Sequence, residues 1–259
     1  MRTMKSVLIA LLCLFASACS QQGMIDRLAP GADVKFAQST LDDLRLGHLD
    51  STRDHLAAKL RTADIDAQLT KIAGYFPAGV PRSVKTVGFR KMIENGESHA
   101  TLAFEYQFDS SWALADMTVS TDGDQRTIEG VHVYRMKQSL EQTNAFNLRG
   151  KSPLHYVFLG LVCVIPLLCL YALVMCLRAP MRGRKWPWVL FILFGFVTVG
   201  FNWTTGAFSV QPISFLLFGA SFFASPYGPW TLSVAFPLGA VWFLLRRRSY
   251  VAVMPPPLK

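Results

Sequence analysis

The second half of this 259-residue chain has no acidic residue. All 17 Asp and Glu residues lie between Asp26 and Glu141, whereas residues 151–259 carry nine Lys and Arg. Between Trp186 and Leu245 there is no Lys, Arg or His either. Coupled transport, proton relays and intramembrane catalysis need ionisable groups at membrane depth. We therefore do not expect any of these functions from the second half.

Cysteine and catalytic motifs are also scarce. Of the five cysteines, only Cys19 lies within residues 19–150, so this part can build neither an internal disulfide nor a thiolate metal site. The chain contains no phosphate-binding loop, no dinucleotide fingerprint, no H-E-x-x-H and no G-x-S-x-G. His48 and His55 are seven residues apart and lack a neighbouring arrangement of carboxylates that would complete a metal site, so we interpret them as surface residues. We expect no metal and no cofactor, and the pattern favours a non-enzymatic protein without deciding the point.

The net charge of +9 is unevenly spread. Residues 20–150 hold 15 bases against 17 acids, a balance of −2, and the remaining bases flank apolar segments. A protein that binds nucleic acid carries its basic residues on one face of a folded domain. Here the basic residues instead predict membrane topology, and we expect no nucleic-acid partner.

The first 31 residues have the pattern of an export signal. Residues 1–18 contain two bases, an apolar run and a small-residue end, which predicts a signal peptide. Ala16-Ser17-Ala18-Cys19 is similar to the bacterial lipoprotein box, which would make Cys19 the lipidated residue. The alternatives are ordinary signal peptidase cleavage and an uncleaved anchor helix. We expect residues 19–31, which follow the predicted signal peptide, to form a tether.

Residues 32–150 predict an exported α+β domain. Apolar residues recur at helical spacing up to Phe76, and Pro77, Gly79 and Pro81 end that region. The period then changes to two, which predicts strands at 84–92, 100–108, 112–119 and 127–136. Asn95-Gly96 and Asp122-Gly123 are typical of tight hairpins. The expected fold is two or three helices followed by a four-stranded antiparallel sheet.

This order of elements, together with the Phe104, Tyr106 and Phe108 strand, resembles the nuclear transport factor 2-like (cystatin-like) domains of bacterial lipoproteins. The resemblance implies a pocket between sheet and helices. Its candidate ligand-binding residues here are Tyr106, Trp112, His132 and Tyr134. Ordinary core packing is the alternative for these aromatics, and it is the one we favour.

Residues 151–250 predict an all-α transmembrane bundle. The spans are expected near 154–177, 187–203 and 229–245, the first of them free of Asp, Glu, Lys and Arg. Segment 207–224 is apolar enough to span but polar in its first half. We interpret it as not crossing, because a crossing would place Arg246, Arg247 and Arg248 outside. Residues 251–259 would form a cytoplasmic tail.

The whole chain resembles uncharacterised bacterial inner-membrane proteins with an exported lipoprotein-like domain. We expect residues 20–150 in the periplasm and the C-terminus in the cytoplasm. The expected function is non-enzymatic binding of a small ligand or an envelope partner, with membrane lipid as a second partner. One alternative is an enzyme that uses the pocket between sheet and helices of this cone-shaped fold, with His132 as the base. Another is an immunity or partner-binding protein of the membrane.

Overall fold

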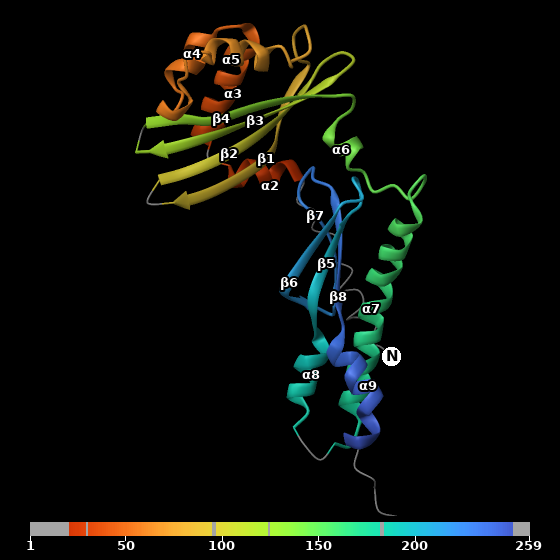
Figure 1. The fold of residues 1–259 in the computed structure, drawn as a ribbon. Helices are drawn as coiled ribbons and strands as arrows, with labels where there is room; N and C mark the ends of the chain where they lie inside the picture. The colour runs from red at the N-terminus through yellow and green to blue at the C-terminus, as the bar shows by residue number, and fades with distance from the viewer. Residues whose placement is uncertain (1–20, 30, 95–96, 124, 182–183, 251–259) are drawn as a thin grey trace, which may run out of the picture. The chain divides into compact units, whose positions relative to one another are not determined.

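The computed structural model describes residues 21–29, 31–94, 97–123, 125–181 and 184–250 (Figure 1). The chain divides into two compact units, Met1–Thr143 and Asn144–Lys259, which we call the α+β unit and the apolar unit. The predicted signal peptide, Cys19 and the predicted tail 251–259 lie outside the described residues.

Apart from one short helix, the helices of the α+β unit precede its sheet, as predicted. They are α2 (Gln21–Leu28), α3 (Gly31–Leu46), α4 (Leu49–Asp54), the 3-10 turn η1 (Ala58–Leu60), α5 (Ile65–Ala73) and, after the sheet, the short α6 (Leu140–Thr143). Helix α2 occupies most of the segment that we expected to be a tether. Ile25 and Ala29, four residues apart, are both buried, and α2 packs against the first strand. This apolar pair explains why the segment folds onto the domain.

The sheet of the α+β unit is an antiparallel meander. Its strands are β1 (Ser83–Glu94), β2 (Glu97–Gln107), β3 (Trp112–Asp122) and β4 (Gln125–Met136), in the order β1-β2-β3-β4. This confirms the predicted α+β class and the four-stranded antiparallel sheet. The pairing of β3 with β4 shifts register between Thr118 and Val119.

The core of this unit lies between one face of the sheet and helices α3 to α5, which cover that face in Figure 1. Strand residues two apart point to the same side, so Ala113, Ala115 and Met117 all face the helices. Other buried residues of this core are Leu41, Leu44, Leu69, Leu102, Phe104, Tyr106, Val119 and Ile128. The opposite face of the sheet carries Asp116 of β3 and His132 and Tyr134 of β4.

In the apolar unit the first predicted span is a helix. Helix α7 runs from Pro153 to Arg178 and coincides with the predicted span 154–177. Its 26 residues have a mean hydropathy of 2.8 over the best window, and it is the one helix among the described residues that is long and apolar enough to cross a membrane. At 1.5 Å per residue it exceeds the roughly 30 Å of bilayer hydrocarbon.

The rest of the apolar unit is not helical throughout, so the predicted all-α bundle is wrong. Its elements are α8 (Trp186–Leu193), β5 (Phe194–Asn202), β6 (Phe208–Leu217), β7 (Ala220–Ala224), β8 (Trp230–Phe236) and α9 (Leu238–Tyr250). The four strands form a second antiparallel sheet in the order β6-β5-β8-β7. Predicted spans 187–203 and 229–245 are each half helix and half strand. Their apolar sequence is rich in aromatic and β-branched residues. These residues raise the hydropathy from which a membrane helix is predicted, but they also favour β-strands.

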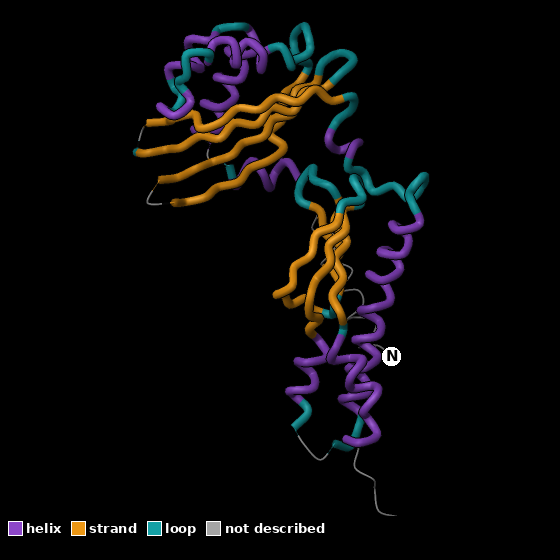
Figure 2. Tube along the Cα trace, viewed as in Figure 1, coloured by secondary structure: helices purple, strands orange, loops and turns teal. Residues whose placement is uncertain are grey.

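Two clusters connect α7 to the rest of this unit. In its N-terminal half, Phe158 packs against Phe201 and Leu232 of the sheet. In its C-terminal half, Cys169 and Cys176 pack with residues of α8 and α9. The sheet therefore lies beside the first half of α7 and the two short helices beside the second half (Figure 2).

Candidate functional site

The open face of the α+β sheet holds a carboxylate beside an imidazole. Asp116 of β3 lies directly opposite His132 of β4 in the register. Oδ2 of Asp116 is 3.3 Å from Nδ1 of His132, and the two side chains are 28% and 63% exposed. Burial raises the pKa of Asp116, and the adjacent His132 opposes part of that rise. The pair can hold and exchange a proton near the protein surface.

A pocket opens next to this pair, between α5 and the outer side of β4. It has a volume of about 640 Å³, and its walls include Ile72, Tyr75, His132, Tyr134 and Arg135. The rings of His132 and Tyr134 are stacked, with their centroids 6.4 Å apart. Tyr75 and Tyr134 are 44% and 54% exposed. The pocket therefore offers aromatic surface and hydroxyl groups to a ligand from both walls.

Arg135 fixes the helical wall of the pocket. Its Nη2 donates to the carbonyl oxygens of Gly74 at 3.4 Å and Phe76 at 3.1 Å, and its Nε donates to that of Tyr75 at 3.4 Å. The last carbonyls of a helix lack partners within the helix, and a cation there is favourable. The guanidinium thus anchors the end of α5 to β4 and holds Tyr75 at the mouth of the pocket.

The four residues predicted to form a ligand pocket do not lie together. Tyr106 is fully buried against the helices, whereas His132 and Tyr134 are on the opposite face. Trp112 is four residues before Asp116 on β3, so it faces the same side of the sheet as Asp116 and His132. The space between sheet and helices that the family resemblance implied as a pocket is occupied by core side chains, Tyr106 among them.

Two partly buried charged residues of α3, Asp42 and Arg45, lie near the buried Tyr106. Burial and the charge of Asp42 raise the pKa of Tyr106 well above its usual range. Burial also raises the pKa of Asp42, against the influence of Arg45, whose Nε is 3.7 Å from Oδ1 of Asp42. The Tyr106 hydroxyl and the Arg45 Nε are both buried without a hydrogen bond among the described residues. Asp42 and Arg45 are one turn apart on α3, a spacing that is visible in the sequence.

The apolar unit has a polar cluster at the start of α7. Nε2 of His155 donates to the carbonyl of Trp203 at 3.2 Å, which leaves Nδ1 to accept from Ser152 Oγ at 2.8 Å. Lys151 Nζ donates to the same carbonyl at 3.0 Å. A serine–histidine pair needs a carboxylate to orient the imidazole for catalysis, and residues 144–259 contain none. We interpret this cluster as an anchor for Trp203.

Sequence reasoning missed Tyr75 and Arg135 as parts of the pocket. Tyr75 follows the end of α5 and Arg135 lies 60 positions later, so only the folded contact joins them. Within the described ranges there is no group of three or more His, Cys, Asp or Glu that could hold a metal ion.

No family model, no curated protein and no solved structure matches this chain.

Proposed function

We propose that this protein is a membrane-anchored envelope protein whose α+β unit binds a partner protein at the outer edge of β4. The carrying observation is the pocket of about 640 Å³ that joins the edge strand to α5 and presents Tyr75 and Tyr134. Tyrosine is enriched in the buried centres of protein interfaces, because it combines apolar area with a polar tip. The binding is non-enzymatic.

The edge strand itself supports a protein partner. β4 is the last strand of the sheet, and near its start Ile128 exchanges backbone hydrogen bonds with His55 and Ala57 at 2.7 and 2.9 Å. From Val131 to Arg135 no described strand pairs with its outer side. An extended segment can add to such an edge, and pockets for alternate side chains then supply specificity. The pocket at 131–135 is placed for this role.

Membrane anchoring is supported by the apolar unit. Helix α7 is long enough to span, and its large apolar side chains point outward in several directions. Exposed examples throughout the unit are Val164, Leu167, Tyr171, Ile213, Phe215, Phe223 and Leu245. A water-soluble protein rarely exposes apolar surface on this scale.

We further propose that the protein resides in a bacterial inner membrane, with residues 20–150 periplasmic and the C-terminus cytoplasmic. Short basic segments stay on the cytoplasmic side. Residues 178–185 and 246–248 are both basic segments of the sequence. Of these, the described residues Arg178, Arg184, Lys185 and 246–248 lie at the same end of the apolar unit, where α7 and α9 end and α8 begins. This arrangement agrees with the orientation inferred from the basic start of the chain.

Site-specific photocrosslinking in native membranes tests the binding surface. Benzoylphenylalanine in place of Tyr134 or Tyr75 should crosslink one discrete partner. The matched control is Ile93, which is 73% exposed on β1, the opposite edge strand. Crosslinking of the same partner at equal yield from Ile93, or no adduct from either tyrosine position, would contradict the proposed surface.

The Asp116–His132 contact favours a second candidate, an enzyme with His132 as a general base. A carboxylate that orients an imidazole is the usual arrangement for such a base. His132→Ala and Asp116→Asn would then abolish cellular function together while the fold stays intact. Under the binding proposal, Tyr134→Ala abolishes function and Asp116→Asn does not.

A further inference from the structure

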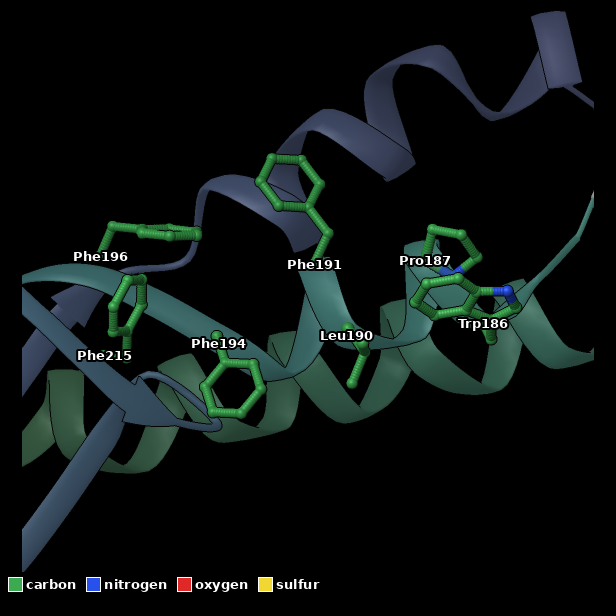
Figure 3. Close-up of a pocket in the computed structure, with 7 residues that line it drawn as sticks. All are labelled: Trp186, Pro187, Leu190, Phe191, Phe194, Phe196 and Phe215. Carbon is green, nitrogen blue, oxygen red and sulfur yellow. The ribbon is translucent and has the colours of Figure 1, made fainter.

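The apolar unit has a pocket of its own, formed by α8 and the two strands that follow it. Its volume is about 540 Å³, and all seven of its lining residues are apolar (Figure 3). Trp186, Leu190 and Phe191 come from α8, Phe194 and Phe196 from β5, and Phe215 from β6. In Figure 3 these side chains line a strip that begins at Trp186 and ends at Phe196 and Phe215. Apart from the indole N–H of Trp186, such a lining offers no side-chain hydrogen bond to a polar ligand.

One end of this pocket lies in the basic part of the unit. Trp186 is the first residue of α8, directly after Arg184 and Lys185. Lys185 Nζ donates to the carbonyl of Leu177 at 2.7 Å, which brings the start of α8 to the end of α7. Arg178 is the last residue of α7. The Trp186 end of the pocket is therefore adjacent in sequence to Arg184 and Lys185, and it lies near the end of α7, where Arg178 stands.

Helix α9 adds further cations at the same end. Trp188 of α8 and Phe243 of α9 are in ring contact at 5.7 Å, and a Cβ at Gly239 would meet the backbone of Phe191. The two helices thus run antiparallel, and the next turn of α9 brings Arg246 and Arg247 toward the start of α8. Arg246 lies over the ring of Trp242, 4.9 Å from its centroid. No acid in residues 144–259 is available to neutralise these bases.

We infer that this pocket binds an acyl chain of an anionic phospholipid, whose phosphate headgroup lies among the basic residues beside Trp186. The inference rests on the proposed membrane anchoring. An acyl chain is linear and apolar, as the strip requires, and the eight residues of α8 give it a wall about 12 Å long. Basic clusters at a membrane surface attract anionic headgroups. An apolar peptide would leave the cations unused, and a free anion would leave the pocket empty.

The test uses the full chain in nanodiscs that contain phosphatidylglycerol with a photoactivatable acyl chain. Peptide mapping should place the label on α8, β5 and the end of β6. Leu190→Trp fills the pocket and should reduce this labelling about tenfold, the effect of losing contact with about two methylenes. Leu167→Trp is the matched control, because Leu167 is exposed on α7 and does not line the pocket. It should leave the labelling unchanged.

A second pair of variants tests the headgroup. Arg184→Gln should weaken labelling by phosphatidylglycerol about fivefold, and Arg149→Gln, a matched change outside the cluster, should not. Phosphatidylcholine that carries the same photoactivatable acyl chain should label the pocket weakly. Equal labelling by both lipids, or label spread evenly over α7, would overturn the lipid site.

Carbonate extraction separates this inference from the anchoring on which it rests. Extraction of the chain into the soluble fraction would overturn both. A chain that stays in the membrane without labelling at α8 would overturn only the lipid site.

Discussion

Two carboxylates in the α+β unit have pKa values displaced in opposite directions. Glu129 is partly buried, which opposes its ionisation, but His99 and Lys59 outweigh this and lower its pKa. His99 Nδ1 is 2.7 Å and Lys59 Nζ 3.4 Å from the Glu129 carboxylate. For Asp116, burial dominates and the pKa is raised. The two residues should therefore contribute to stability with opposite dependence on pH.

We expect Glu129→Gln to destabilise the protein at neutral pH and not in acid. A lowered pKa means that the folded state favours the ionised form, so its contribution is present above the ordinary value near 4.5 and is lost as pH falls through the folded pKa. The side chain is 21% exposed, so the loss at pH 7 should be below about 1 kcal/mol. Urea unfolding of residues 21–143 across this pH range measures it.

Asp116→Asn is the matched comparison and should behave in the opposite sense. With a raised pKa, the folded state holds the proton longer, so the wild-type free energy of unfolding falls as pH rises above 3.8. The amide removes this fall and still can accept a hydrogen bond from His132. The variant should be at least as stable as the wild type at pH 7. A loss of stability at pH 7 in Asp116→Asn, parallel to the loss in Glu129→Gln, would show that the pKa direction given for Asp116 is wrong.

At the scale of the elements, the connection between β6 and β7 requires a residue without a side chain at position 219. Phe218 and Gly219 are consecutive residues with positive φ, 56° and 67°. A Cβ at Gly219 would lie 2.8 Å from Cγ2 of Ile165 on α7 and 3.4 Å from the carbonyl of Ala235. The turn therefore needs glycine both for its backbone and for its close approach to α7.

We expect Gly219→Ala to destabilise the apolar unit more than Gly206→Ala. Both positions have positive φ, but the nearest atom to a Cβ at Gly206 is 3.9 Å away. In both variants the strained backbone should lower the free energy of unfolding by about 1–2 kcal/mol. Only Gly219→Ala should lower it by a further 1–3 kcal/mol, roughly, because its new methyl group overpacks the contact with α7. Thermal unfolding of the full chain in detergent measures the difference. Equal midpoints would mean that β6–β7 does not pack on α7 as described.

At the scale of the whole molecule, the uneven distribution of charge predicts a sidedness. All 17 acids belong to the α+β unit, and the apolar unit has basic residues at the ends of its helices. The chain should therefore insert in one orientation, with the basic helix ends in the cytoplasm.

Alkaline phosphatase fusions measure this orientation. Fused after Gly150, before α7, the enzyme should be active, because it would be exported. Fused after Lys185, beyond α7, it should be inactive. The reverse pattern of activities would refute the orientation, and equal activity at both points would mean that α7 does not cross.

The candidate site shows how far a strand pattern can be interpreted. Alternation correctly places His132 and Tyr134 on one face of β4, because side chains alternate along a strand. It does not tell which face the helices cover. Tyr106 pairs with Ala113, and His132 with Asp116, three positions further along β3, so the register puts them on opposite sides of the sheet.

The sequence by itself determined the helix-then-sheet order of the first unit and a long apolar helix near residues 154–177, which is α7 in the structure. These follow from local signals: periodicity, turn residues and an uninterrupted apolar run. Only the tertiary structure decided the second sheet and both pockets. Where nearly every residue is apolar, polarity has no period from which helix and strand can be distinguished. The pockets join Tyr75 to Tyr134 and Trp186 to Phe215, pairs that are distant in the chain and meet only when the elements pack.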